Sequence, residues 1–202
     1  TALRNLNTTV YNLRRSLEPE LKRGSDSKYV IYEGGQYSFT DSGHYWLDVD
    51  AFVQGVQRAR SETTIEQRLQ RYEQCLALYQ GDYLSDLRYT EVWSHSQHLR
   101  LQTLYLNAVE ELASIYSSQG RHQEAEELYS QALAIDPYRE SVIRQLIDLL
   151  LQRGRRAEAI SRYEHWRTSL REELDIEPSD ETRAAIKAVR RPHPVSPIAI
   201  AR

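Results

Sequence analysis

The side chains best suited to binding chemistry lie near the start of the chain, on one face of a segment with helical spacing. Asn and Thr can hydrogen-bond to base edges, and Arg recognises guanine or holds a phosphate. A helix with such a face fits the major groove of DNA. A solvated amphipathic helix would show the same pattern, so the residue types alone leave both interpretations open. The polar face carries Arg4, Asn5, Thr8, Thr9, Tyr11, Asn12 and Arg15.

The other reactive residue types do not match a motif for catalysis or metal binding. His95 and His98 have the spacing of one helix face, but a pair falls short of the four ligands typical of zinc. Cys75 is the single cysteine and is expected to be a packed core thiol. No nucleophile elbow, phosphate-binding loop or acid–base motif occurs in the sequence. The sequence therefore predicts a protein that is not an enzyme and that needs no metal or cofactor.

Composition limits the classes of partner. The chain has 202 residues, enough for one full domain and part of another. Its net charge of −3 gives no overall attraction to nucleic acid, so any such affinity must be local. Residues 1–28 carry a charge of +3 and the remainder −6. One cysteine fits a reducing compartment, and no apolar run could span a membrane or act as a signal peptide, so a cytoplasmic protein is expected.

Hydrophobic periodicity predicts the elements that must position these side chains. Apolar residues spaced by three and four predict a helix over 2–17. Two β-rich runs, 29–33 and 36–40, flank Gly34-Gly35 and predict a hairpin. A proline-rich tail or linker is expected over 191–202. Helices are expected over 48–61, 64–80, 89–119, 122–134, 139–153, 156–173 and 179–190.

The most specific feature is an internal repeat with a step of 34 residues. This period, with Gly between helices and small or aromatic residues at fixed offsets, is the tetratricopeptide signature. It predicts a mainly α, tetratricopeptide-like domain over 46–190, to which residues 48–80 supply a further unit. Trp93 and Trp166 are expected to anchor the core between helices. The matching pairs are Leu112/Leu146, Gly120/Gly154, Arg121/Arg155, Glu124/Glu158, Ala125/Ala159 and Tyr129/Tyr163.

Several blocks resemble the bacterial transcriptional activator domain, which occurs in regulators of the antibiotic-regulatory-protein type. The resemblance covers about residues 47–186. Asp175 departs from the pattern, because the family commonly has glycine there, and only a local turn is expected to change. The blocks are LDVDAF (47–52), LALYQGDYL (76–84), Trp93, Gly120-Arg121, DPYRES (136–141), LLQRGRRAEAISRYE (150–164) and ELDIEPSDETR (173–183).

The same family implies a role for residues 1–45 as the last part of a response-regulator-type winged helix. Residues 4–17 are similar to its recognition helix, which typically ends in L-R-R-x-L, and the 29–40 hairpin is similar to its wing. The missing strands and two helices of that domain are expected before Thr1, in the intact protein. By this alignment Asn5, Thr8, Thr9 and Asn12 face bases, Arg4, Arg14 and Arg15 mostly meet phosphate, and Lys28 either touches the DNA backbone or is an ordinary solubilising lysine.

The preferred interpretation is a sequence-specific transcription activator that binds promoter DNA. Its repeat domain would hold subunits in a homodimer, sense an effector or contact RNA polymerase; no membrane partner is implied. The alternative is a tetratricopeptide scaffold that binds protein and not DNA. Such scaffolds often bind peptides in a concave groove, here at Asn107, Glu110, Glu111 and Ser114, where the two glutamates are expected to repel a carboxylate.

Overall fold

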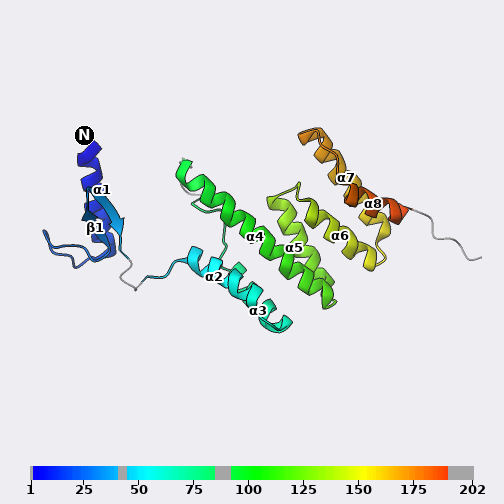
Figure 1. The fold of residues 1–202 in the computed structure, drawn as a ribbon, viewed down its shortest axis with the longest axis horizontal. Helices are drawn as coiled ribbons and strands as arrows, with labels where there is room; N and C mark the ends of the chain where they lie inside the picture. The colour runs from blue at the N-terminus through cyan, green and yellow to red at the C-terminus, as the bar shows by residue number, and fades with distance from the viewer. Residues whose placement is uncertain (1, 41–44, 85–91, 191–202) are drawn as a thin grey trace, which may run out of the picture. The chain divides into compact units, whose positions relative to one another are not determined.

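The computed structural model describes residues 2–40, 45–84 and 92–190. The chain forms two compact units, Thr1–Leu47 and Asp48–Arg202, which are described separately (Figure 1). The tail expected over 191–202 lies outside the described residues. Within the described ranges, no helix has the length and apolar character needed to cross a membrane.

The first unit consists of one helix and one hairpin, both as expected from the sequence. Helix α1 spans Ala2–Leu17. Strands β1 (Val30–Glu33) and β2 (Gln36–Phe39) pair antiparallel, with Val30 opposite Phe39 and Glu33 opposite Gln36. Gly34 and Gly35 form the two-residue turn with φ of 59° and 84°, a conformation that glycine adopts without steric cost.

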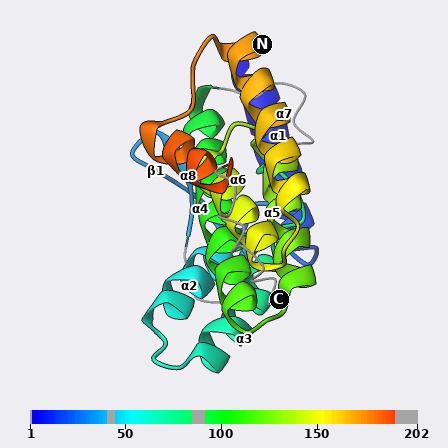
Figure 2. The ribbon, with the colours of Figure 1, turned by 90° about the vertical axis from the view of Figure 1, so that its right-hand side faces the viewer.

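The second unit is a row of helical hairpins, and the prediction of a mainly helical, tetratricopeptide-like fold is confirmed. Consecutive helices pack in pairs, α2 with α3, α4 with α5 and α6 with α7, and α8 packs on α7 (Figures 1 and 2). The helices are α2 (Asp48–Ser61), α3 (Ile65–Leu76), α4 (Val92–Ser118), α5 (His122–Ile135), α6 (Glu140–Gln152), α7 (Arg156–Leu174) and α8 (Asp180–Arg190).

Helix α3 is shorter than expected, because it ends at Leu76 and not near residue 80. The backbone N–H of Leu78 donates to Cys75 and that of Tyr79 to Leu76, so the chain turns there. Tyr79 nevertheless stacks on Tyr105, with ring centroids 4.1 Å apart. The apolar pattern therefore continues past the helix because its aromatic residues still pack on the core.

The 34-residue repeat is a repeat of local geometry as well as of sequence. Gly120 and Gly154 end α4 and α6 with φ of 77° and 73°. The residue after each glycine donates its N–H back into the helix, Arg121 to Tyr116 at 2.9 Å and Arg155 to Leu150 at 2.8 Å. These bonds, with those of the glycine N–H groups, form the Schellman motif, which satisfies carbonyls at a helix end.

Buried small and aromatic residues form the core between the hairpins. Ala125 and Ala159 are fully buried, and Tyr129 and Tyr163 are nearly so. Cys75 is buried as expected, and burial raises the pKa of its thiol. Trp166 is buried as predicted, whereas the side chain of Trp93 lies outside the described part of the structure.

Helices α2 and α3 are in close contact at Gly55, and this contact predicts the effect of adding one methyl group. A Cβ on Gly55 would lie 2.5 Å from the Cβ of Cys75, an atom fixed to the backbone. In Gly55→Ala this clash outweighs the helix propensity of alanine, and we expect the free energy of unfolding to fall by about 1–2 kcal/mol. Urea unfolding followed by circular dichroism measures the change. In the matched variant Gly81→Ala the added Cβ meets open space, so an equal loss there would contradict the explanation.

Asp175 ends α7 in the left-handed conformation, with φ 55° and ψ 36°. An L side chain is strained there and glycine is not, which explains why a glycine suits this turn. We expect Asp175→Gly to raise the free energy of unfolding by about 0.5–1 kcal/mol. Asp136 ends α5 at a φ of −128°, so the matched variant Asp136→Gly should be destabilising. Thermal unfolding of both variants tests this, and a stability loss in Asp175→Gly would contradict it.

Candidate functional site

The polar face of α1 is exposed along its whole described length. Arg4, Asn5, Thr8, Thr9, Asn12 and Arg15 are all exposed. The hydroxyl of Thr8 donates to the carbonyl of Arg4 at 2.9 Å, and that of Thr9 donates to Asn5 at 3.0 Å. Both hydroxyl oxygens still have acceptor capacity, so this face can donate through Asn and Arg and accept through Asn and Thr.

The opposite side of α1 is attached to the hairpin through residues spaced by three and four. Val10 is buried, and the hydroxyl of Tyr37 donates to Asn7 at 3.2 Å. Arg14 donates from Nε and Nη2 to the carbonyl of Val30 at 3.0 and 2.6 Å, and its guanidinium carbon lies 5.9 Å from the centre of the Tyr37 ring. Arg14 is thus engaged within the unit, whereas Arg15 next to it is exposed.

A second attachment lies at the base of the hairpin, where Glu18 follows α1. The buried hydroxyl of Ser27 donates to the Glu18 carboxylate, and the backbone N–H of Lys28 donates to both carboxylate oxygens at 3.1 Å. The N–H groups of Tyr29 and Val30 donate to the same Ser27 oxygen. The Ser27 bond, followed by those of the Lys28 backbone and its charge, holds the pKa of Glu18 below its usual value. These bonds fix the start of β1 and leave the side chain of Lys28 exposed.

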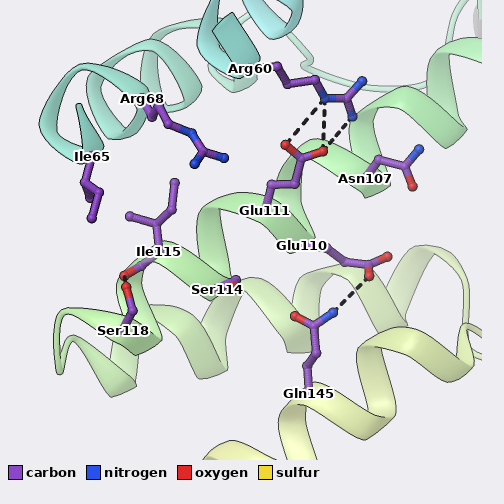
Figure 3. A pocket seen from close by; sticks show the side chains of 10 residues that line it. All are labelled: Arg60, Ile65, Arg68, Asn107, Glu110, Glu111, Ser114, Ile115, Ser118 and Gln145. Carbon is purple, nitrogen blue, oxygen red and sulfur yellow. Dashed lines mark hydrogen bonds and ion pairs between the residues drawn. The ribbon is translucent and has the colours of Figure 1, made fainter. Parts of the chain in front are cut away.

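The helical unit contains a groove of about 630 Å³, lined by α2, α3, α4 and α6 (Figure 3). Arg60 and Glu111 form an ion pair across it, with Nη2 2.7 Å from Oε1. The hydroxyl of Tyr72 also donates to Glu111, and burial, reinforced by this bond, raises the pKa of Tyr72 to about 12. The lining residues are Arg60, Ile65, Arg68, Asn107, Glu110, Glu111, Ser114, Ile115, Ser118 and Gln145.

The negative charge of Glu110 is also compensated, by an arginine on the other side of the groove. It pairs with Arg139, and both side chains are mostly buried. Gln145 donates to its second oxygen at 3.2 Å, and Arg139 also donates to the side-chain oxygen of Asn107. The expectation that two glutamates would repel a carboxylate assumed unpaired glutamates. The structure corrects that assumption, because Glu110 and Glu111 are each paired with an arginine.

The histidine pair lies on α4. Within residues 2–40, 45–84 and 92–190, no three His, Cys, Asp or Glu side chains group closely enough to hold a metal ion. His95 is exposed and His98 is half-buried on α4. Among the described residues, the α1 face and the groove both present side chains suited to binding.

Comparison with known proteins places the helical unit in a family. Residues 47–190 match the bacterial transcriptional activator domain. The chain belongs to this family. This confirms the resemblance noted in the sequence, and Asp175 lies within the matched range.

Two curated relatives are named transcriptional regulatory protein MoaR1, from Mycobacterium tuberculosis and Mycobacterium bovis. Each is 27% identical over an alignment of 199 residues, and the alignment covers 96% of this chain but only 62% of the relative. A structure of Mycobacterium tuberculosis EmbR, in complex with a low-affinity phosphopeptide, superposes with a TM-score of 0.74 at 24% identity. It covers 96% of this chain and 51% of EmbR, and at this identity it shows that the fold is shared.

The exposed side of α1 could be predicted from the sequence, whereas the contacts that hold the helix on the hairpin could not. Arg14 lies beside the apolar stripe of α1 and not on the predicted polar face, but the spacing did not show its acceptor. Glu18 and Ser27 lay in a segment that was not expected to form specific contacts. The sequence did not indicate four residues at the groove, which are Arg60, Arg68, Arg139 and Gln145. The sequence block DPYRES contains Arg139 and therefore marked this residue. The block does not indicate that Arg139 pairs with Glu110.

The Glu18 attachment predicts how the carboxylate titrates when its main donor is removed. In Ser27→Ala we expect the pKa of Glu18 to rise toward the ordinary value of 4.5, because the Ser27 hydroxyl is the largest cause of its lowering. Carboxyl carbon NMR across a pH series measures this. Because the carboxylate is favoured in the folded unit, its stabilising effect is complete above the ordinary pKa and is lost as pH falls through the lowered one. Ser25→Ala is the control, and an unchanged Glu18 pKa in Ser27→Ala would refute the assignment.

Proposed function

We propose that the intact protein is a DNA-binding transcriptional activator, in which α1 lies in the major groove of promoter DNA. The observation that carries this proposal is the exposed Asn, Thr and Arg face of α1, held on the hairpin by its opposite side. A helix fixed in this way can present side chains to base edges without first becoming ordered. Family membership and the two relatives named as transcriptional regulators support the same function.

In this proposal the side chains of unit 1 divide into three roles. Asn5, Thr8, Thr9 and Asn12 contact bases, and Arg4, Arg15 and Lys28 contact phosphates. Arg14 acts by positioning α1, because its Nε and Nη2 already donate to Val30. The local charge of +3 over residues 1–28 favours DNA on this unit, whereas the rest of the chain is acidic.

The helical unit serves regulation and not catalysis in this proposal. It joins subunits into a homodimer on repeated sites or contacts RNA polymerase, and the protein works in the bacterial cytoplasm. Support comes from the relatives named as transcriptional regulatory proteins and from the groove lined by α2, α3, α4 and α6, which offers a surface for a partner. The resulting function is promoter recognition by unit 1 and protein contact by unit 2.

The test is binding of the full-length protein to fragments of its own genome, by fluorescence anisotropy over a series of salt concentrations. Arg15→Gln should weaken binding to all fragments and lower the slope of log K against log salt by about 1. Asn12→Ala should weaken the binding free energy for the preferred fragment by about 1–3 kcal/mol and reduce the preference for it over other fragments. Lack of preference for any fragment by the unmodified protein would refute the proposal.

Two controls separate contact from folding. Arg58→Gln removes an exposed arginine from α2 and should leave affinity and salt slope unchanged. Arg14→Gln should weaken binding together with loss of the α1–hairpin contacts in NMR spectra, whereas Arg15→Gln keeps those contacts. A normal hairpin spectrum with weakened binding in Arg14→Gln would assign Arg14 to direct DNA contact.

A further inference from the structure

One arginine in the groove of the helical unit has no hydrogen-bond acceptor or ion-pair partner among the described residues. Arg68 extends from α3 into the groove beside α4 (Figure 3). Its Nε is buried and has no hydrogen-bond acceptor among the described residues. No carboxylate in the described ranges forms an ion pair with it. A partly buried guanidinium without an anion is a costly group unless something binds to it.

The groove carboxylates nearby are already occupied. Both oxygens of Glu111 accept hydrogen bonds, one from Arg60 at 2.7 and 3.0 Å and the other from Tyr72. The two oxygens of Glu110 accept from Arg139 and Gln145. Arg68 therefore adds a positive charge to a groove whose two lining carboxylates are each compensated.

The groove also presents hydrogen-bond donors beside Arg68. The oxygen of Asn107 accepts from Arg139, and its NH₂ group donates to no acceptor in the described part of the chain. Ser114, one turn after Glu111 on α4, is exposed at the groove surface. Ile65 and Ile115 provide an apolar border. A ligand that accepts hydrogen bonds and carries one negative charge has the complementary chemistry.

We propose that this groove is a protein-binding site in which Arg68 pairs with an Asp or Glu side chain of an acidic segment from a partner protein. Ser114 donates to the same segment, and Ile65 and Ile115 contact its apolar neighbours. The site is separate from the α1 face. It adds to the proposed DNA-binding function and does not depend on it.

A protein segment fits the groove better than a nucleic acid does. One uncompensated arginine matches one carboxylate, whereas a nucleic acid brings a charge at every nucleotide. A space of about 630 Å³ has the size of a site for a few side chains.

The experiment is an NMR titration of the full chain with two pools of capped hexapeptides, made with degenerate flanks and either Glu or Gln at a fixed central position. The arginine Nε–H signals report on Arg68 directly. We expect the Glu pool to shift the Arg68 signal and to bind about tenfold more tightly than the Gln pool. Arg68→Gln should abolish that difference. Arg71→Gln, which removes the same charge from an exposed position on α3, should retain it.

A second variant keeps Arg68 and adds one negative charge to the groove. Ser114→Asp places a carboxylate at an exposed position of α4 and should weaken binding of the Glu pool by about tenfold. The thermal unfolding transition of this variant should be unchanged. Equal binding of the two pools overturns the proposal, as do equal losses in Arg68→Gln and Arg71→Gln. An Arg68-dependent response to oligothymidylate with none to the Glu pool would assign the groove to nucleic acid instead. Because no promoter DNA is present, the result is independent of the α1 hypothesis.

Discussion

The helical unit depends on small residues at the points where its helices cross. Gly55 lets α2 approach Cys75 of α3, and Ala125 and Ala159 are fully buried at matching positions of the two regular repeats. Close backbone approach sets the spacing of successive hairpins. That spacing brings side chains from α2, α3, α4 and α6 to one groove. The small, uncharged residues at the helix crossings therefore determine where the charged side chains of the groove lie.

The parts of the fold that follow from neighbouring residues could be predicted from the sequence. The 34-residue repeat determined the α4–α7 hairpins, because Gly120 and Gly154 end their helices by bonds made within six residues. The hairpin of unit 1 followed from two strands around a pair of glycines. The end of α3 was placed too late, because Tyr79 continues the apolar pattern although its backbone has left the helix.

The binding chemistry of the groove could not be predicted, because its pairs join residues far apart in sequence. Arg60 and Glu111 are 51 positions apart, and Arg139 and Glu110 are 29 apart. Spacing alone showed two adjacent glutamates on α4, which suggested an acidic surface. Only the packed hairpins show that Glu111 meets Arg60 of α2 and that Glu110 meets Arg139 at the start of α6. The same limit applies to Arg14, whose acceptor, the Val30 carbonyl, lies 16 positions away.

Whether an arginine can bind a ligand depends on the acceptors that the fold has already given it. Arg14 donates to a backbone carbonyl and Arg60 to a carboxylate, so moving either toward a ligand would first break those bonds. Arg15 makes only a 3.4 Å contact with the Tyr11 hydroxyl, and Arg68 has no acceptor within the described residues. Arg15 is exposed within residues 1–28, which carry a net charge of +3, and this suits a phosphate backbone. Arg68 is half-buried in a groove whose glutamates are already paired. The difference in surroundings, and not in side-chain type, assigns one arginine to a polyanion and the other to a single carboxylate.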